Sequence, residues 1–510
     1  MSKKNIYQPI PASQFEFVGD EGRLRDKKLE TKPIGYFKDV MLRFARNKSS
    51  VVAAIIILIL VLYAVLVPFF CETTYSRALT DTTYLSYTKL PPRSKLLGWL
   101  GLDGTSKVTV NYNDYLKMKS IGEETGLDPV LEEYRVNYVD PTASKNSTFC
   151  DLRVDDYYKM GMTYLTLTPG QYEELQAWQD KTGVQVIYPA ITDSKQSDAN
   201  IWYKANKKGV PIVDADGHFE NIYKTTTPSD TSYHSIRIDA DNDPDKPLAY
   251  ARVTGTSDAR AYVVRVSKYN YFRYRYGFEP AFMFGTNTKG QDILTRLAAG
   301  ARFSFLLAIC ISAINLFIGA IYGAIEGYYG GAVDMVMERI SDILSGIPFI
   351  VVTTLFQLHL ASKVGPVVAL LFAFVLTGWI GMASRVRMQF YRFKGQEYIL
   401  SARTLGASDW RLMFKHIFPN SLGTIITGSV LVIPGVIFSE SSLTYLNIVN
   451  LESSTMTSVG TMLANGRGTL STDPYIIFCP ALFISLLEIS FNLFGNGLRD
   501  AFNPSLRGVE

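Results

Sequence analysis

The chain alternates between long apolar stretches and polar segments. Because an α-helix rises about 1.5 Å per residue, about 20 apolar residues are needed to cross the hydrocarbon core of a bilayer. The stretches that reach this length lie at residues 51–70, 301–325, 343–361, 366–384, 422–448 and 475–494. The pattern predicts a polytopic α-helical membrane protein with six transmembrane helices.

A polar segment precedes the first span. Residues 1–35 carry mixed charge without periodicity, which predicts a flexible cytoplasmic leader. The segment that follows, up to residue 50, is amphipathic and is expected to lie on the membrane surface as an elbow helix. Its apolar positions at helical spacing are Phe37, Val40, Met41 and Phe44. The span at 51–70 has no small-residue cleavage site behind it, so a retained transmembrane helix is predicted.

Residues 71–283, between the first two spans, are too many for a structureless connection. One helix is fully specified there, because Thr168 is a candidate N-cap, Pro169 takes the first helical position and Gly183 is a stop signal. A second helix is expected within residues 114–135. Alternating or β-branched runs predict strands at residues 107–113, 184–191 and 261–276. We therefore expect an inserted α+β domain.

Composition changes this picture little. The chain has 510 residues, 47% of them hydrophobic, and a mean hydropathy of +0.08, which fits a membrane protein diluted by a large soluble part. A formal charge of +4 gives no reason to expect nucleic-acid binding. Cys71, Cys150, Cys310 and Cys479 lack the spacing of metal ligands. A disulfide between Cys71 and Cys150 stays open, since only these two could share an oxidising compartment.

Basic residues predict the orientation. Arg43, Arg46 and Lys48 stand directly before the first span, and residues 385–420 carry seven more lysines and arginines. Cytoplasmic loops are enriched in such residues, so both segments are expected in the cytoplasm. Threading six spans from an inside N-terminus gives the same result. It places the C-terminus inside and residues 71–300 outside, and we expect a multi-pass protein of the cell membrane with a large extracellular domain.

The segment 397–420, EYILSARTLGASDWRLMFKHIFPN, is polar and basic yet lies between two apolar runs. Its small residues at helical spacing would let another protein approach the backbone closely, and a proline stands before the next span. The pattern resembles the EAA loop of ABC-importer permeases, with Leu400 where that family has its name-giving Glu. The alternative is an ordinary amphipathic helix on the membrane surface. The residues that the resemblance implies in ATPase coupling are Ser401, Ala402, Gly406, Ala407 and Pro419.

Other motifs extend the resemblance along the chain. Glycine, threonine, acidic and arginine residues at 284–302 lead into the second span, and Gly327 to Gly331 follow it. Together with the tail at 492–507, these motifs are similar in type and order to the C-type permease subunit of oligopeptide and dipeptide ABC importers. The resemblance covers the chain apart from the leader and residues 71–283. It identifies residues 284–510 as a permease core with five transmembrane helices.

The resemblance implies a function and partners. It implies the type I ABC importer permease fold, and half of a translocation pathway for peptides. The expected partners are a homologous second permease subunit, two cytoplasmic ATPase subunits, an extracellular substrate-binding protein and the lipid bilayer. ATP and Mg²⁺ would bind the ATPase subunits, with no cofactor in this chain. Two alternatives stay open: a permease for nickel, opines or another small solute, and a membrane-anchored sensor or adhesion protein with a functional ectodomain.

Carboxylates within or beside spans are costly unless they find water or a partner, so each marks a pathway or an interface. For Glu326, near the inner end of its span, we expect the side chain to reach the surface. Glu440 is expected to make either a structural hydrogen bond or part of the pathway lining. Glu488 lies deeper and is expected to face a neighbouring helix or the pathway.

Some chemistry is missing from the sequence. There is no Gly-x-x-x-x-Gly-Lys-Ser/Thr loop, so the chain should not hydrolyse ATP, and no catalytic residue is assigned. The histidines are too dispersed for a zinc site. Alternating aspartates at 239–245 begin like a calcium loop, but Pro244 stands where an EF-hand needs Gly. A solvated acidic turn is the preferred interpretation, and no metal site is assigned.

Overall fold

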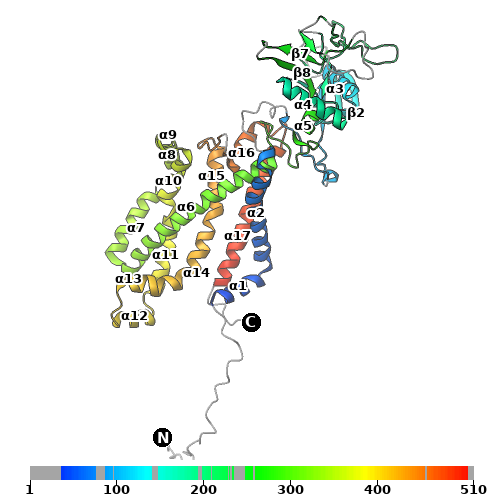
Figure 1. Cartoon of the computed structure of the whole chain (residues 1–510). Helices are drawn as coiled ribbons and strands as arrows, with labels where there is room; N and C mark the ends of the chain where they lie inside the picture. The colour runs from blue at the N-terminus through cyan, green and yellow to red at the C-terminus, as the bar shows by residue number, and fades with distance from the viewer. Residues whose placement is uncertain are drawn as a thin grey trace, which may run out of the picture.

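The computed structural model describes residues 36–75, 87–95, 97–139, 148–192, 198–207, 209–227, 229, 232–234, 247–256, 259–453 and 456–502. The leader at 1–35 and the aspartates at 239–245 lie outside these ranges, so the predictions made for them are not tested. Figure 1 shows a helical bundle with the α+β region beyond one of its ends. Helices α12 and α1 lie toward the other end.

The bundle is built from helices on both sides of the α+β region. They are α1 (Tyr36–Arg46), α2 (Lys48–Tyr75), α6 (Ile293–Tyr329), α7 (Gly331–Ser345), α8 (Phe349–His359), α9 (Ala361–Val364), α10 (Pro366–Gly378), α11 (Ile380–Phe393), α12 (Glu397–Thr404), α13 (Asp409–Arg411), the π-helical turn η5 (Leu412–Ile417), α14 (Phe418–Val430), α15 (Val432–Tyr445), α16 (Val459–Gly466), η6 (Arg467–Thr469) and α17 (Tyr475–Phe502).

Within the described residues, five continuous helical stretches are long and apolar enough to cross a membrane. A sixth span exists only if α7 and α8, which meet at 71°, form one broken crossing. The span predicted at 343–361 is therefore not one continuous helix, and the sixth crossing stays a prediction. Gly346 and Pro348 explain the break, because proline has no amide hydrogen and disfavours the helical conformation of the residue before it.

Helices α6 and α11 pack unusually closely. Gly319, Gly323 and Gly327 recur every four residues and so form one stripe along α6. A Cβ on Gly319 would lie 2.7 Å from the Trp379 carbonyl oxygen, and one on Gly327 would lie 2.7 Å from the Arg387 carbonyl oxygen. Only glycine permits this approach of two backbones, which gives membrane helices their dispersion contacts.

The α+β region contains two antiparallel sheets. Its elements are η4 (Gly98–Leu100), β1 (Thr105–Asn111), α3 (Tyr112–Thr125), β2 (Val130–Val139), β3 (Thr148–Asp155), β4 (Met162–Leu167), α4 (Pro169–Thr182), β5 (Ile187–Tyr188), β6 (Tyr233–His234), β7 (Ala251–Thr254), β8 (Ala261–Ser267) and α5 (Lys268–Tyr276). One sheet has the order β1-β3-β2, and the other has β4-β8-β7-β6 with β5 also pairing with β8.

Local signals in this region gave mixed predictions. Helix α4 is confirmed, with a Thr168 capping box and Gly183 in the left-handed conformation at φ +72°. The helix predicted within 114–135 ends at Thr125, because Gly126 at φ +70° closes it, and the segment that follows forms β2.

The strand predicted at 261–276 is correct only up to Ser267. The Ser267 side chain accepts a hydrogen bond from the Asn270 amide and begins α5. Tyr269 and Phe272 then turn inward and are buried in a cluster of aromatic rings. Tertiary packing has here overridden the strand preference of aromatic residues.

A buried ion pair joins β8 of one sheet to helix α3, which follows β1 of the other sheet. Arg265 of β8 and Glu124 at the end of α3 contact each other with almost no exposure of either side chain. Arg265 also donates to the Pro189 carbonyl at 2.8 Å, and the Tyr223 hydroxyl donates to Glu124 at 2.8 Å. Burial raises the pKa of Glu124, and the neighbouring guanidinium opposes that shift.

The cysteines of this fold show no disulfide at Cys150. Cys150 is a free, buried thiol of β3, and its sulfur accepts a hydrogen bond from the Asn137 amide at 3.4 Å. The side chain of Cys71 lies outside the part of the chain that the structure describes.

Candidate coupling site

Helix α12 ends in a turn that requires glycine. Gly406 has φ +83°, a conformation that L side chains rarely adopt. Its amide donates to the Arg403 carbonyl at 3.0 Å, and the Ala407 amide donates to the Ala402 carbonyl at 3.1 Å. These two bonds form a Schellman motif, which satisfies the last carbonyls of the helix.

The structure separates the predicted site residues into two groups. Ala402 and Ala407 are half-buried and pack against a hydrophobic cluster. The members of that cluster on this segment are Ile399, Leu412, Met413 and Ile417. Ser401, Gly406 and Pro419 are exposed. The two alanines are therefore small because they seat the turn on the bundle, whereas the other three residues face outward.

Two apolar side chains on the outer surface of this segment were missed by the sequence reasoning. Leu405 is 88% exposed and Trp410 is 63% exposed. An apolar residue beside a glycine in a basic loop was the available signal, because nothing in such a loop would bury it. Large apolar side chains exposed within one short segment are typical of a surface that another molecule covers.

The segment is tied to α6 by polar contacts. The Tyr328 hydroxyl donates to Asp409 Oδ1 at 2.5 Å, and Arg403 Nη2 donates to the Tyr328 hydroxyl at 3.1 Å. Tyr328 stands in the last turn of α6. These contacts connect α12 and α13 to the last turn of α6.

Arg387 of α11 forms a second junction at the same end of the bundle. It makes two hydrogen bonds with Asp334, at 2.6 and 2.8 Å, and contacts Glu338 at 2.9 Å. Its Nε also lies 3.6 Å from Glu326 Oε1. Glu326 is only 3% exposed, so the expectation that it reaches the surface is wrong: a cation is available inside the bundle.

Pro419 does not end the segment. Residues Asp409–Tyr445 form one continuous helical stretch, and Pro419 lies in the first turn of α14. The preceding turn η5 is π-helical. Since proline removes one helical hydrogen bond, a locally widened turn accommodates it without a stop.

The two predicted membrane carboxylates have different surroundings. Glu440 is buried and accepts hydrogen bonds from Ser304 and Thr444, each at 3.1 Å. These contacts support the structural hydrogen bond that was one of its two expected roles. Glu488 is half-buried, and Asn492 Nδ2 donates to its carboxylate at 3.5 Å.

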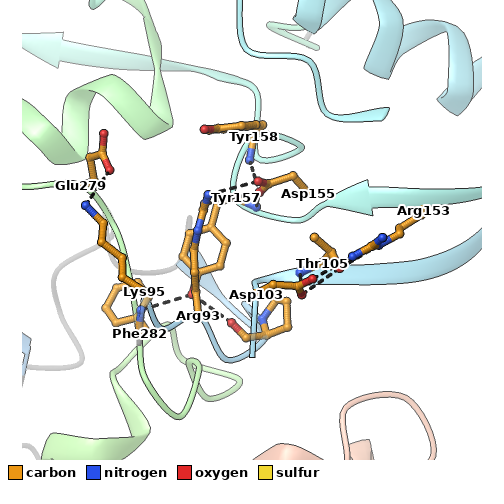
Figure 2. Close-up of polar contacts among 11 residues, drawn as sticks. Arg93, Lys95, Asp103, Thr105, Arg153, Asp155, Tyr157, Tyr158, Glu279 and Phe282 are labelled. Atoms are coloured by element: carbon orange, nitrogen blue, oxygen red, sulfur yellow. Dashed lines mark hydrogen bonds and ion pairs between the residues drawn. The ribbon is translucent and has the colours of Figure 1, made fainter. Parts of the chain in front are cut away.

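Two segments, residues 91–95 and 279–282, connect the α+β region to the bundle and are called the neck here (Figure 2). The Arg93 amide donates to the Phe282 carbonyl at 2.8 Å, so the segment that enters the α+β region and the segment that leaves it lie side by side. The Arg93 guanidinium contacts Asp155 at 3.3 Å, and the Tyr157 hydroxyl donates to the Pro91 carbonyl at 2.9 Å. Burial raises the pKa of Asp155, while Arg93 opposes the shift.

Long apolar helices packed through glycines, with a small exposed helix at one end, define a polytopic helical membrane protein. Two family models match it on either side of the α+β region. The binding-protein-dependent transport system inner membrane component matches residues 315–508, and the N-terminal TM domain of oligopeptide transport permease C matches residues 35–92.

Individual relatives agree with the family models. The chain is 40% identical over 224 residues to the oligopeptide transport system permease protein OppC of Bacillus subtilis, covering 44% of this chain and 72% of the relative. It is 39% identical over 225 residues to the dipeptide transport system permease protein DppC of that organism, covering 44% and 69%. The glutathione transport system permease protein GsiD of Pectobacterium atrosepticum is 32% identical over 249 residues, covering 48% and 81%. The chain belongs to the family of binding-protein-dependent transport permeases.

Proposed function

We propose that the protein is one of two membrane subunits of an ABC importer for peptides, driven by ATP hydrolysis on separate subunits. The segment 397–420 docks on an ATPase subunit in the cytoplasm, and the α+β region lies outside the cell. The observation that carries the proposal is the exposed Leu405 on a turn otherwise anchored to the bundle. Figure 1 places this segment and the α+β region toward opposite ends, as the orientation requires.

The contacts around α12 provide a route by which motion of an ATPase subunit reaches the membrane helices. Ala402, Ala407 and the Tyr328–Asp409 bond fix α12 to the bundle, so α12 and the end of α6 move together. Arg387 links the same end of α6 to α7 and α11. When ATP binding closes the ATPase subunits, the docked turn carries these helices between inward-facing and outward-facing arrangements.

A pair of alanine variants tests the coupling turn. A Cβ on either Gly406 or Gly395 would meet open space, but only Gly406 has a positive φ. Gly406→Ala should strain the turn by about 1–2 kcal/mol and lower the peptide transported per ATP hydrolysed, whereas Gly395→Ala should not. Reconstituted complexes measure both rates. Unchanged coupling in Gly406→Ala and in the bulkier Gly406→Trp would contradict the assignment.

For the α+β region we propose a docking surface for the external binding protein or for the substrate. Its place between two matched family segments, beyond the bundle, motivates this role. Lys95 and Glu279 form an ion pair of 3.6 Å at the neck, so residues 96–279 can be replaced by a short glycine–serine linker. The shortened chain should keep its membrane core but bind the external protein more weakly. Equal affinity would exclude the docking role.

Peptides are the proposed cargo because similar relatives carry oligopeptide and dipeptide transport names. Nickel, opines and other small solutes are the alternative. The family assignment favours a permease over the sensor or adhesion protein. Titration of the cognate external binding protein with a peptide library, and with nickel or opines, distinguishes the cargoes.

A further inference from the structure

A cavity of about 310 Å³ lies between α11, α14 and α17. It stands toward the end of the bundle that carries α12, since α11 precedes α12 and α14 follows α13 directly. Its charged lining consists of Arg385 and Arg392 from α11 and Arg499 from α17. Arg385 and Arg392 are seven residues apart, which places them on one face of α11 two turns from each other.

These arginines lack acidic partners within the part of the chain that the structure describes. Arg385 Nη1 donates to the Gly428 carbonyl at 3.1 Å. The guanidinium groups of Arg392 and Arg499 make no hydrogen bond or ion pair with any described residue. All three arginines are exposed, and the Arg392 guanidinium lies over the Phe393 ring at 5.6 Å from its centroid. Each guanidinium carries five N–H donors, so most of the donors at this cavity contact no described group of the protein. Arg387 lies on a different face of α11 and has by contrast two acidic partners within 3 Å.

Glycines on α14 keep the cavity open. A Cβ on Gly428 would lie 2.7 Å from Arg385 Nη1, and a Cβ on Gly423 would lie 2.9 Å from Phe502 Cδ1. Thr424 and Thr427 add hydroxyl groups to the same wall. The site thus combines unpaired positive charge, hydroxyl groups and a floor that larger residues would fill.

We propose that this cavity binds a phosphate group, supplied by an anionic phospholipid headgroup or by free phosphate. Guanidinium groups match phosphate oxygens in charge and in bidentate geometry. Basic pockets between helices at the cytoplasmic side of a membrane are suited to lipid headgroups. Assignment to the inner leaflet rests on the proposed orientation, whereas phosphate binding itself does not.

The test uses the full chain with its partner subunits in lipid nanodiscs. Native mass spectrometry after delipidation measures the phosphatidylglycerol and phosphatidylcholine that the complex retains. Wild type should retain phosphatidylglycerol preferentially, and Arg392→Gln or Arg499→Gln should each weaken that retention about fivefold. Both variants leave the protein's described hydrogen bonds intact. Arg339→Gln, which removes an equal charge from an exposed pair with Asp342, should have no effect.

A second arm identifies the source of the phosphate. Inorganic phosphate that raises the melting temperature of the lipid-depleted wild type, but not of Arg392→Gln, would show that free phosphate occupies the cavity. Gly428→Ala keeps every charge yet crowds Arg385, and should weaken either ligand. The proposal is overturned if wild type, Arg392→Gln and Arg499→Gln retain the two lipids alike and none of them responds to inorganic phosphate. A failed ATPase docking test would leave these binding results unaffected.

Discussion

The membrane core and the α+β region are held together by different interactions. In the core, α6 and α11 approach through Gly319, Gly323 and Gly327, where the two backbones leave no space for a Cβ atom. In the α+β region, aromatic clusters and the buried Arg265–Glu124 pair carry the packing. The difference follows from the surroundings, because lipid offers no hydrophobic drive for helix association whereas water does. A substitution that destabilises one region should therefore leave the other folded.

The largest expected effect comes from the buried ion pair. Glu124→Gln leaves the Arg265 guanidinium buried beside a neutral group and should cost the α+β region about 3–5 kcal/mol. Hydrogen exchange of the full chain, followed by mass spectrometry, should show lost protection in β8 and α3 but unchanged protection in α6. Glu173→Gln, on the exposed face of α4, is the matched control. Loss of protection in both regions would contradict the claim that the two regions are stabilised independently.

The converse variant acts on the core. Gly323→Ala inserts a Cβ into the Ala383 backbone and should destabilise the bundle by about 1–3 kcal/mol. Gly381→Ala, whose Cβ meets open space, should be neutral or slightly stabilising. Thermal unfolding in detergent measures both. Equal melting temperatures for the two variants would show that the glycine stripe does not set the packing.

A smaller effect tests local capping in the α+β region. Thr168→Ala removes the side chain that accepts from the Gln171 amide, and should cost about 1 kcal/mol. Thr168→Ser keeps the acceptor and should recover most of the loss. Amide exchange in the first turn of α4 is the measurement. A loss shared equally by the alanine and serine variants would point to the methyl group instead of the cap.

The smallest effect is a dependence on pH. Burial alone would raise the pKa of Asp103, but hydrogen bonds from Thr105 and Arg153 outweigh it and lower the pKa. A lowered folded pKa means stability that is present above the unfolded value of about 3.9 and is lost as pH falls through the folded pKa. Protection of β1 should decline in acid below about pH 4. Asp103→Asn should flatten that decline, and an unchanged profile would remove Asp103 as its source.

Sequence patterns predicted the core better than the α+β region. Runs such as 51–70 and 475–494 lie within α2 and α17, because bilayer thickness constrains both length and polarity. The break between α7 and α8 was missed, since Gly346 and Pro348 interrupt the helix without interrupting the apolar run. In the α+β region, caps such as Thr168 and Gly183 were readable, whereas α5 was not. The burial of α5 depends on rings far away in sequence, such as Tyr87 and Tyr157.

In the segment 397–420, too, some features could be predicted from the sequence and others could not. Gly406 was identified from its spacing, and the small residues at 402 and 407 were expected to face a partner. Both are half-buried and pack against the bundle, because a Schellman turn brings them onto one hydrophobic cluster. Their contact with an ATPase subunit stays a prediction. Leu405 stands beside Gly406 in a basic loop, which was a usable signal, but helical spacing alone does not reveal the reversal of direction that exposes it.

The central claim is that the turn at Leu405 docks on an ATPase subunit. A photo-reactive phenylalanine analogue at position 405 tests it directly in the assembled importer, with the same analogue at position 99 as control. Trp99 is 80% exposed and belongs to the α+β region. The account predicts a cross-link from position 405 to the ATPase subunit and none from position 99. Absence of an ATPase adduct at 405, with assembly verified, would contradict it.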